Sequence, residues 1–179
     1  AGKTTTFYMT VGLVTPNEGE IFLNDLNITK YPVYKRAQNG IGYLAQEPSV
    51  FRKMSVEDNI RSVLEMTNTT KEYQKDKLES LISEFSLEKV RRNLGDQLSG
   101  GEMQRVAIAR AIASKPTVIF SDEATGNLDE KNSIQVMEML CDICKKHNTS
   151  LVFVTHDISL TKYADKTKKF DFELGLIDV

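Results

Sequence analysis

Two short, continuous apolar runs, TVIFS at 117–121 and SLVFVT at 150–155, flank a long helical stretch at 133–146. Runs of this kind are typical of strands that are buried on both faces of a parallel sheet. Parallel neighbours need a crossover connection, which is usually a helix. The second half of the chain therefore predicts a layered α/β domain.

The first half predicts short, mixed elements. We expect a helix at 2–13, a strand at 21–25, a short helix at 33–39 and a glycine-bounded strand at 40–46. The tail FDFELGLIDV predicts two short strands that bend at Gly175.

The segment from about 55 to 97 contains only helical patterns. Ser55 and Asp58 have the spacing of a capping box at a helix start. Four apolar residues then recur at helical spacing and should be buried: Leu78, Leu81, Ile82 and Phe85. We expect a helical subdomain inserted into one domain that spans 1–179.

Composition excludes several classes of protein. The chain has 40% hydrophobic and 27% charged residues and a formal net charge of −2, as in ordinary globular proteins. This balance argues against nucleic-acid binding driven by bulk charge. No apolar run approaches the roughly 20 residues that cross a bilayer. We interpret Cys141 and Cys144 as two inert thiols in a reducing, cytoplasmic compartment.

The N-terminal run AGKTT has the sequence of the second half of a phosphate-binding loop. Lys3 would reach the β- and γ-phosphates, and the Thr4 hydroxyl would bind Mg²⁺. An ordinary polar terminus is the alternative reading of these residues.

The run VIFSDE places two carboxylates, Asp122 and Glu123, at the end of a buried strand, where α/β sheets bind ligands. Asp122 would hold Mg²⁺ and Glu123 could polarise an attacking water. Acidic residues also end strands without any chemistry.

The run LSGGE predicts a second anion site, at the start of a helix with Val106, Ala109 and Ile112 on its inner face. Ser99, Gly100 and Gly101 would offer a hydroxyl, backbone N–H groups and the positive end of the helix dipole. Two anion-binding helix starts on one chain, at AGKTT and at LSGGE, suggest that two chains enclose a nucleotide between them. A glycine-rich turn before a helix is the alternative.

In this order the motifs resemble those of the nucleotide-binding subunits of ATP-binding-cassette (ABC) transporters, which are P-loop NTPases. Besides AGKTT, LSGGE and VIFSDE, the chain has counterparts of the Q-loop at Gln46, the D-loop GNLD at Asp129 and the switch histidine of VTHD at His156. The resemblance covers nearly the whole chain.

The resemblance implies a role for each matching residue. Lys3 and Thr4, within the run from Gly2 to Thr5, would hold the phosphates and Mg²⁺, and Gln46 would sense the metal and the membrane partner. Glu123 would be the general base, and His156 would steady the γ-phosphate and the attacking water. Asp129 would lie at the dimer interface. Ser99, Gly100 and Gly101 would contact the ATP that is held by the partner chain.

The same resemblance implies the setting. It implies ATP and Mg²⁺ as cofactors, a second ATPase subunit in a homodimer, membrane-spanning partner subunits and a peripheral place at the cytoplasmic face of the inner membrane. No nucleic acid is expected as a partner.

The chain also departs from the family pattern. The strand that feeds the phosphate loop, the first half of that loop and the aromatic residue that stacks on adenine are absent. We therefore expect residues 1–179 alone to be poorly folded and to bind ATP weakly. Ala124 stands where the family usually has proline.

The two halves favour different branches of the family. The run around Gln46 resembles lipopolysaccharide-export ATPases, and the segment after LSGGE is more like lipoprotein-release and macrolide-export ATPases. Lipopolysaccharide export is the favoured function, because the resemblance implies that the run around Gln46 is where such ATPases meet their membrane partner. Val50, Phe51 and Met54 of that run could be exposed for docking, with core packing as the alternative. A non-transport ABC ATPase and a binding-only fragment are the other classes considered.

Overall fold

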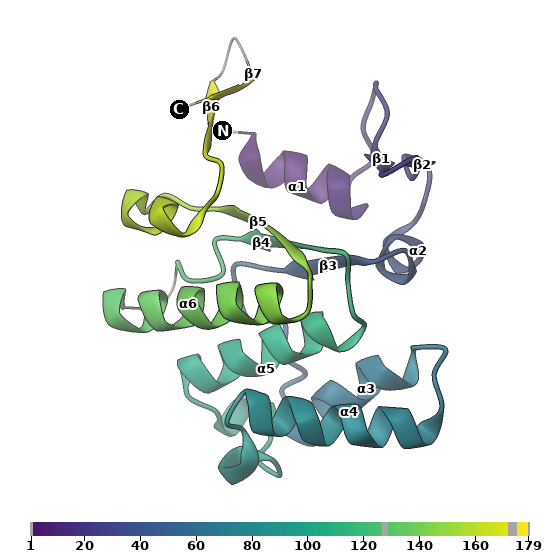
Figure 1. The fold of residues 1–179 in the computed structure, drawn as a ribbon, viewed down its shortest axis with the longest axis vertical. Helices are drawn as coiled ribbons and strands as arrows, with labels where there is room; N and C mark the ends of the chain where they lie inside the picture. Colours follow the sequence, from purple (N-terminus) through teal and green to yellow (C-terminus); the bar gives the residue numbers. More distant parts are fainter. Residues whose placement is uncertain (1, 127–128, 172–174, 179) are drawn as a thin grey trace.

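A three-stranded parallel sheet lies at the centre of the structure, a computed structural model that describes residues 2–126, 129–171 and 175–178. The strands lie in the order β3 (Ile41–Leu44), β4 (Val118–Asp122) and β5 (Ser150–Val154). Leu44 pairs with Ser121, and Asp122 pairs with Val154. The carboxyl ends of all three strands therefore meet at one edge (Figure 1). This arrangement confirms the predicted layered α/β fold.

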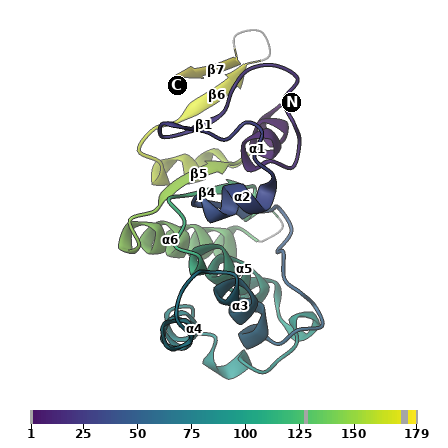
Figure 2. The same ribbon diagram turned by 90° about the vertical axis from the view of Figure 1, so that its right-hand side faces the viewer.

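Helices cover both faces of this sheet (Figures 1 and 2). Helix α1 (Lys3–Val11) lies on one face, and α5 (Gly100–Ala113) and α6 (Glu130–Lys146) lie on the other. The predicted inner face of α5 is fully buried, with 0% exposure at Val106, Ala109 and Ile112. Burial of this apolar stripe fixes α5 beneath the sheet.

The strand expected at 21–25 is instead a small antiparallel hairpin of β1 (Phe22–Leu23) and β2 (Leu26–Asn27). Asn24 has a φ of 51°, a left-handed conformation that ends an extended run. Helix α2 (Val33–Gln38) follows the hairpin and contacts β3.

Segment 55–97 is built from helices, as its sequence pattern indicates. It contains α3 (Val56–Glu65), α4 (Lys71–Glu84) and two 3₁₀ turns, η1 (Glu88–Val90) and η2 (Gly95–Gln97). The Ser55 hydroxyl accepts a hydrogen bond from the Asp58 N–H at 3.0 Å, so the expected cap is present. The four predicted apolar residues are all buried. Both helices pack on α5 and share its core.

The C-terminal part contains the 3₁₀ helix η3 (Ile158–Tyr163) and an antiparallel pair, β6 (Lys168–Asp171) and β7 (Gly175–Asp178). The tail thus contains two strands, as expected, but the bend is not at Gly175, which is the first residue of β7 and pairs with Asp171. Residues 172–174 and Val179 of that tail lie outside the described residues.

The two apolar strands differ in burial, contrary to expectation. Most of β4 is buried, whereas β5 is only partly covered and its Val152 is 41% exposed. The reason is position: β4 has a neighbour on each side, and within the described residues β5 pairs with β4 alone. In the part of the chain that the structure describes, no helix is both long enough and apolar enough to cross a membrane.

Candidate functional site

Three elements bring the predicted chemical groups together at the carboxyl edge of the sheet. The first turn of α1 supplies Lys3 and Thr4, the end of β4 supplies Asp122 and Glu123, and the segment after β5 supplies His156. Figure 1 shows the start of α1 on the same side as the ends of these strands. Residues far apart in the sequence thus form one polar cluster.

Thr4 and Asp122 contact each other across α1 and β4. The Thr4 hydroxyl donates a hydrogen bond to Oδ1 of Asp122 at 3.3 Å. Burial raises the pKa of Asp122, and the neighbouring charge of Glu123 adds to the rise, while Thr4 and Lys3 oppose it. A carboxylate in this environment gains from a cation that would neutralise it.

The donor set of this pair suits Mg²⁺. Magnesium prefers hard oxygen ligands and usually binds through one or two protein groups, together with water and substrate phosphates. Among the described residues, no three His, Cys, Asp or Glu side chains form a metal-binding group. Thr4 and Asp122 therefore fit a Mg²⁺ that is held partly by phosphate, and they do not fit an all-protein metal site.

Lys3, His156 and Glu123 form a chain of polar contacts. His156 Nε2 lies 2.7 Å from Oε1 of Glu123, and the Lys3 ammonium lies 3.4 Å from His156 Nδ1. The His156 side chain is 72% exposed, against 20% for Glu123. A carboxylate beside an exposed imidazole is a suitable group to accept a proton from water.

The backbone turn after β4 directs the Glu123 carboxylate. Glu123 has a φ of 50°, which is uncommon for a residue with a side chain. Its N–H donates to the Val154 carbonyl at 3.1 Å, and its own carbonyl accepts from the Gly126 N–H at 2.8 Å. These hydrogen bonds hold the turn, so the position of the carboxylate is set by the backbone.

The start of α1 is open to an anion. Gly2 precedes the helix with a φ of 100°, and neither a side-chain cap nor an acidic residue occupies the first turn. The free N–H groups and the helix dipole favour a negative ligand there. Thr5 is exposed in the same turn.

The LSGGE run lies at the start of α5, on the other face of the sheet from α1 (Figure 1). Ser99 caps α5 and forms a capping box with Glu102, whose Oε2 accepts from the Ser99 hydroxyl at 2.7 Å and from its N–H at 2.8 Å. These bonds lower the pKa of Glu102. Gly100 and Gly101 follow as the first residues of the helix. Sequence reasoning missed the role of Glu102, although its spacing from Ser99 is that of a capping box.

Gln46 is exposed and lies two residues beyond β3, at the same edge of the sheet as Asp122. Asp129 caps α6, accepting from the Asn132 N–H at 2.9 Å, and this bond lowers the pKa of Asp129. Among the described residues, neither Gln46 nor Asp129 forms a hydrogen bond or ion pair with Lys3. Asn127 and Leu128 of the GNLD run lie outside the described residues.

The run after Gln46 is divided between surface and core. Phe51 is 51% exposed, and the Arg110 guanidinium lies 4.4 Å from the centre of its ring. Val50 packs against the main core and Met54 is half-buried. Of the three residues considered for docking, Phe51 is the one that is exposed.

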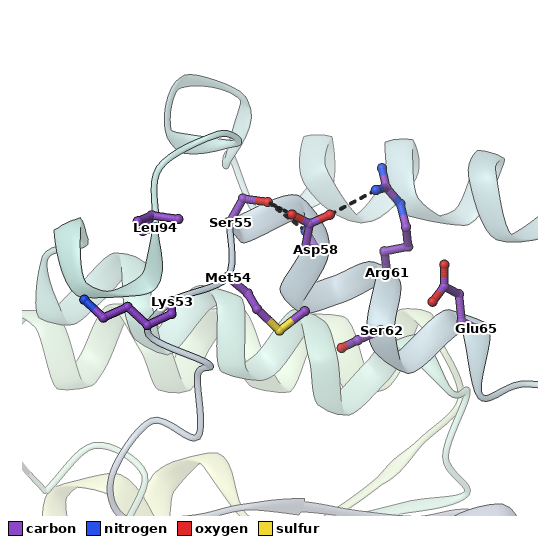
Figure 3. A pocket seen from close by; sticks show the side chains of 8 residues that line it. All are labelled: Lys53, Met54, Ser55, Asp58, Arg61, Ser62, Glu65 and Leu94. Carbon is purple, nitrogen blue, oxygen red and sulfur yellow. Dashed lines mark hydrogen bonds and ion pairs between the residues drawn. The ribbon is translucent and has the colours of Figure 1, made fainter.

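A pocket of about 360 Å³ is lined by Met54 and by α3 residues that include Asp58, Arg61 and Glu65 (Figure 3). Three of its polar lining groups are engaged with each other: Ser55 donates to Asp58, and Arg61 forms an ion pair with Asp58. None of the phosphate-site residues lines this pocket. It is therefore separate from the site at the sheet edge.

The cysteines have no part in the site. Both are free, and burial raises the pKa of Cys144 to about 11. A thiol with that pKa is protonated at neutral pH and is a poor nucleophile. This agrees with the interpretation of inert thiols.

The fold and the site together define the class of protein. A parallel sheet ends in a carboxylate pair, and a helix whose first turn carries lysine and threonine faces that pair. This is the architecture of a P-loop NTPase.

Comparison with known proteins identifies the family. The ABC transporter family model matches residues 1–126. The lipopolysaccharide export system ATP-binding protein of Acidithiobacillus ferridurans is 42% identical over 161 residues, or 90% of this chain and 66% of that protein. An uncharacterized ABC transporter ATP-binding protein of Rhizobium meliloti is 47% identical over 178 residues, or 99% of this chain and 61% of that protein.

A solved dimeric ATP-binding cassette bound to ADP and Pi has a TM-score of 0.79 and 27% identity, over 92% of this chain and 74% of that chain. The chain belongs to the ABC transporter family. It spans less than two thirds of the length of the Rhizobium relative and 66% of the Acidithiobacillus relative.

Proposed function

We propose that this chain hydrolyses ATP as the nucleotide-binding subunit of an ABC transporter. The observation that supports this most is the convergence of Thr4 with Asp122 and of Lys3 with His156 and Glu123. Each contact joins groups from separate elements at the edge where parallel sheets bind ligands. The expected chemistry is transfer of the γ-phosphoryl group of ATP to water.

In this mechanism the first turn of α1 binds phosphate. Its N–H groups and the Lys3 ammonium contact the β- and γ-phosphates. Thr4 and Asp122 hold Mg²⁺, which neutralises charge on the phosphate oxygens when it is bound. Gly2 and Thr5 complete the turn.

Glu123 acts as the general base. Its carboxylate accepts the proton of the attacking water, while His156 orients that carboxylate and contacts the γ-phosphate. Gln46, at the same edge of the sheet, would sense the metal when Mg²⁺ is bound. The roles of Gln46 and His156 come from their family counterparts and their place at this edge.

A complete site needs two chains. Ser99, Gly100 and Gly101, at the start of α5, lie on the opposite face of the sheet from α1. In our proposal these residues contact ATP that is held by a second copy. Asp129, at the start of α6, lies at the proposed interface between the two copies. The dimeric state of the solved cassette supports this arrangement.

The transported molecule is lipopolysaccharide in our proposal, which rests on the 42% identity to the Acidithiobacillus protein. The chain would then bind membrane-spanning subunits at the cytoplasmic face of the inner membrane, with Phe51 at the contact. The segment SDEATGNLDE favours a lipoprotein-release or macrolide-type exporter as the second candidate.

One experiment tests both levels of the proposal. The protein as encoded in its organism is purified with the membrane subunits encoded beside it and reconstituted in vesicles. We expect Mg²⁺-dependent ATP hydrolysis that lipopolysaccharide stimulates. Stimulation by lipoprotein or a macrolide instead would reassign the substrate, and absence of ATP hydrolysis would refute the ATPase.

A further inference from the structure

Arg36, on α2, is a buried cation whose contacts are all with backbone carbonyls. Its side chain is 2% exposed. Nη1 donates to the carbonyls of Met9 and Thr10, each at 2.7 Å; Nε donates to that of Tyr31 at 2.8 Å, and Nη2 to that of Thr29 at 2.9 Å. One guanidinium thus joins the end of α1 to the segment that leads into α2.

Two of these acceptors belong to the last turn of α1. Carbonyls in the last turn of a helix have no helical partner and need another donor. They also carry the negative end of the helix dipole, which favours a cation. Arg36 satisfies both requirements, and it therefore fixes the C-terminal end of α1.

Gly12 shows that the space is shaped for this guanidinium. A Cβ at Gly12 would lie 2.9 Å from Nε of Arg36, and the φ of Gly12 is 91°. Any side chain at this position would push on Arg36 as well as strain the backbone. The glycine and the arginine form one structural unit.

The other end of α1 is held more weakly. Its polar contacts are those of Thr4 with Asp122 at 3.3 Å and of Lys3 with His156 at 3.4 Å, and no side chain caps it. The contact of Phe7 with Phe120 holds the helix on the sheet, but apolar contacts lack direction. The rotation of α1 about its axis must then be set by the directional hydrogen bonds that Arg36 makes at its C-terminal end.

We propose that Arg36 is a positioning residue that sets where Lys3 and Thr4 meet the phosphates of ATP. Lys3 and Met9 are separated by about 9 Å along the helix axis, so a small rotation at one end displaces the other. A displacement of about 1 Å can cost a hundredfold in rate. The role rests on the proposed ATPase function and adds to it a residue outside the motifs.

The first test replaces Arg36 by lysine in the protein as encoded. Lysine keeps the charge, but one ammonium cannot reproduce the fork that reaches four carbonyls. We expect kcat to fall at least tenfold while the KM for ATP changes less than threefold. Thr149→Ala is the control, because Thr149 is also buried and donates to a backbone carbonyl, that of Pro116, but it immediately precedes β5 and, within the described residues, bonds to neither α1 nor the proposed site. Its kcat, corrected for the folded fraction, should stay within twofold.

A matched pair of glycine variants tests the same point with Arg36 intact. Gly12→Ala crowds the guanidinium, whereas Gly19→Ala, at a φ of 87°, meets nothing within 4 Å. Both carry the strain of a positive φ, and of the two only Gly12→Ala also crowds the Arg36 guanidinium. We expect at least a tenfold loss of kcat for Gly12→Ala and less than a twofold loss for Gly19→Ala.

Amide hydrogen exchange gives a readout that needs no activity. Exchange across 3–11 should quicken in Arg36→Lys and Gly12→Ala and stay unchanged in Gly19→Ala. Equal kcat in both glycine variants, or failure of both Arg36→Lys and Gly12→Ala to fold, would overturn the positioning role. If the parent protein itself does not hydrolyse ATP, the proposed function fails, and the exchange data still decide whether Arg36 holds α1.

Discussion

The Nε2 atom of His156 lies 2.7 Å from Oε1 of Glu123, although the two residues follow different strands. Strands β4 and β5 are parallel neighbours, with Asp122 paired to Val154. Their carboxyl ends therefore deliver the two side chains to the same point. This contact links the proposed base to the residue that contacts Lys3.

Glu123→Gln should keep ATP binding and nearly abolish turnover. The amide preserves the shape of the side chain but cannot accept the proton of the attacking water. Loss of a positioned base typically costs about 10²–10⁴ in rate. Single-turnover hydrolysis and nucleotide-binding assays measure the two effects separately. Hydrolysis within twofold of the parent rate would contradict the assignment.

Lys3 and Ser99 should act on the same nucleotide from different chains. A Lys3→Ala protein and a Ser99→Ala protein should each be inactive, and mixing them should restore hydrolysis, because one site of each heterodimer keeps both residues. Heterodimers are counted with two affinity tags. No recovery at any mixing ratio, despite proven heterodimers, would refute the two-chain site.

Asp122→Asn should raise stability at neutral pH while it weakens Mg²⁺-dependent hydrolysis. Burial raises the pKa of Asp122, so ionisation in the folded state is costly and the asparagine variant avoids that cost. A gain of about 1 kcal/mol corresponds to about 2–4 °C in Tm for a domain of this size.

The gain in stability of the Asp122→Asn variant should depend on pH. A raised carboxyl pKa lowers stability as the pH climbs from the ordinary aspartate range, about 4, through the folded-state value. The Tm of parent and variant should therefore converge as the pH falls toward 4. Asp165→Asn is the control, since Asp165 is exposed and its replacement removes no buried charge. A gain that persists unchanged at low pH would point to a different cause.

Glu102→Ala should destabilise the start of α5. Loss of a hydrogen bond typically costs about 0.5–1.5 kcal/mol, and here the Ser99 N–H loses its carboxylate acceptor while Ser99 itself remains as the cap. The pKa of Glu102 is lowered, so its contribution is present above the ordinary glutamate range and is lost as the pH falls below it. Thermal unfolding of parent and variant at pH 7 and pH 3 measures this. A difference in Tm that is as large at pH 3 as at pH 7 would contradict the role of the carboxylate.

Local pattern was sufficient to predict most elements. Helical spacing located the buried face Leu78–Phe85, and the spacing of Ser55 and Asp58 located the start of α3, because helix periodicity and caps depend on near neighbours. The hairpin at Asn24 was missed because an apolar run does not show where the backbone takes a positive φ. The exposure of Val152 was missed because burial of a strand depends on its place in the sheet.

The types of residue and their order specify the chemical groups of this protein, its hydroxyl, ammonium, carboxylate and imidazole side chains, and the family to which that order belongs. Which of these groups meet is established by the folded arrangement alone. It joined Thr4 to Asp122 and His156 to Glu123, kept Ser99 with Glu102 on the other face, and placed Arg36 at the end of α1. The physical reason is that these contacts depend on strand register and helix orientation, which are fixed by burial of apolar surface across the whole domain.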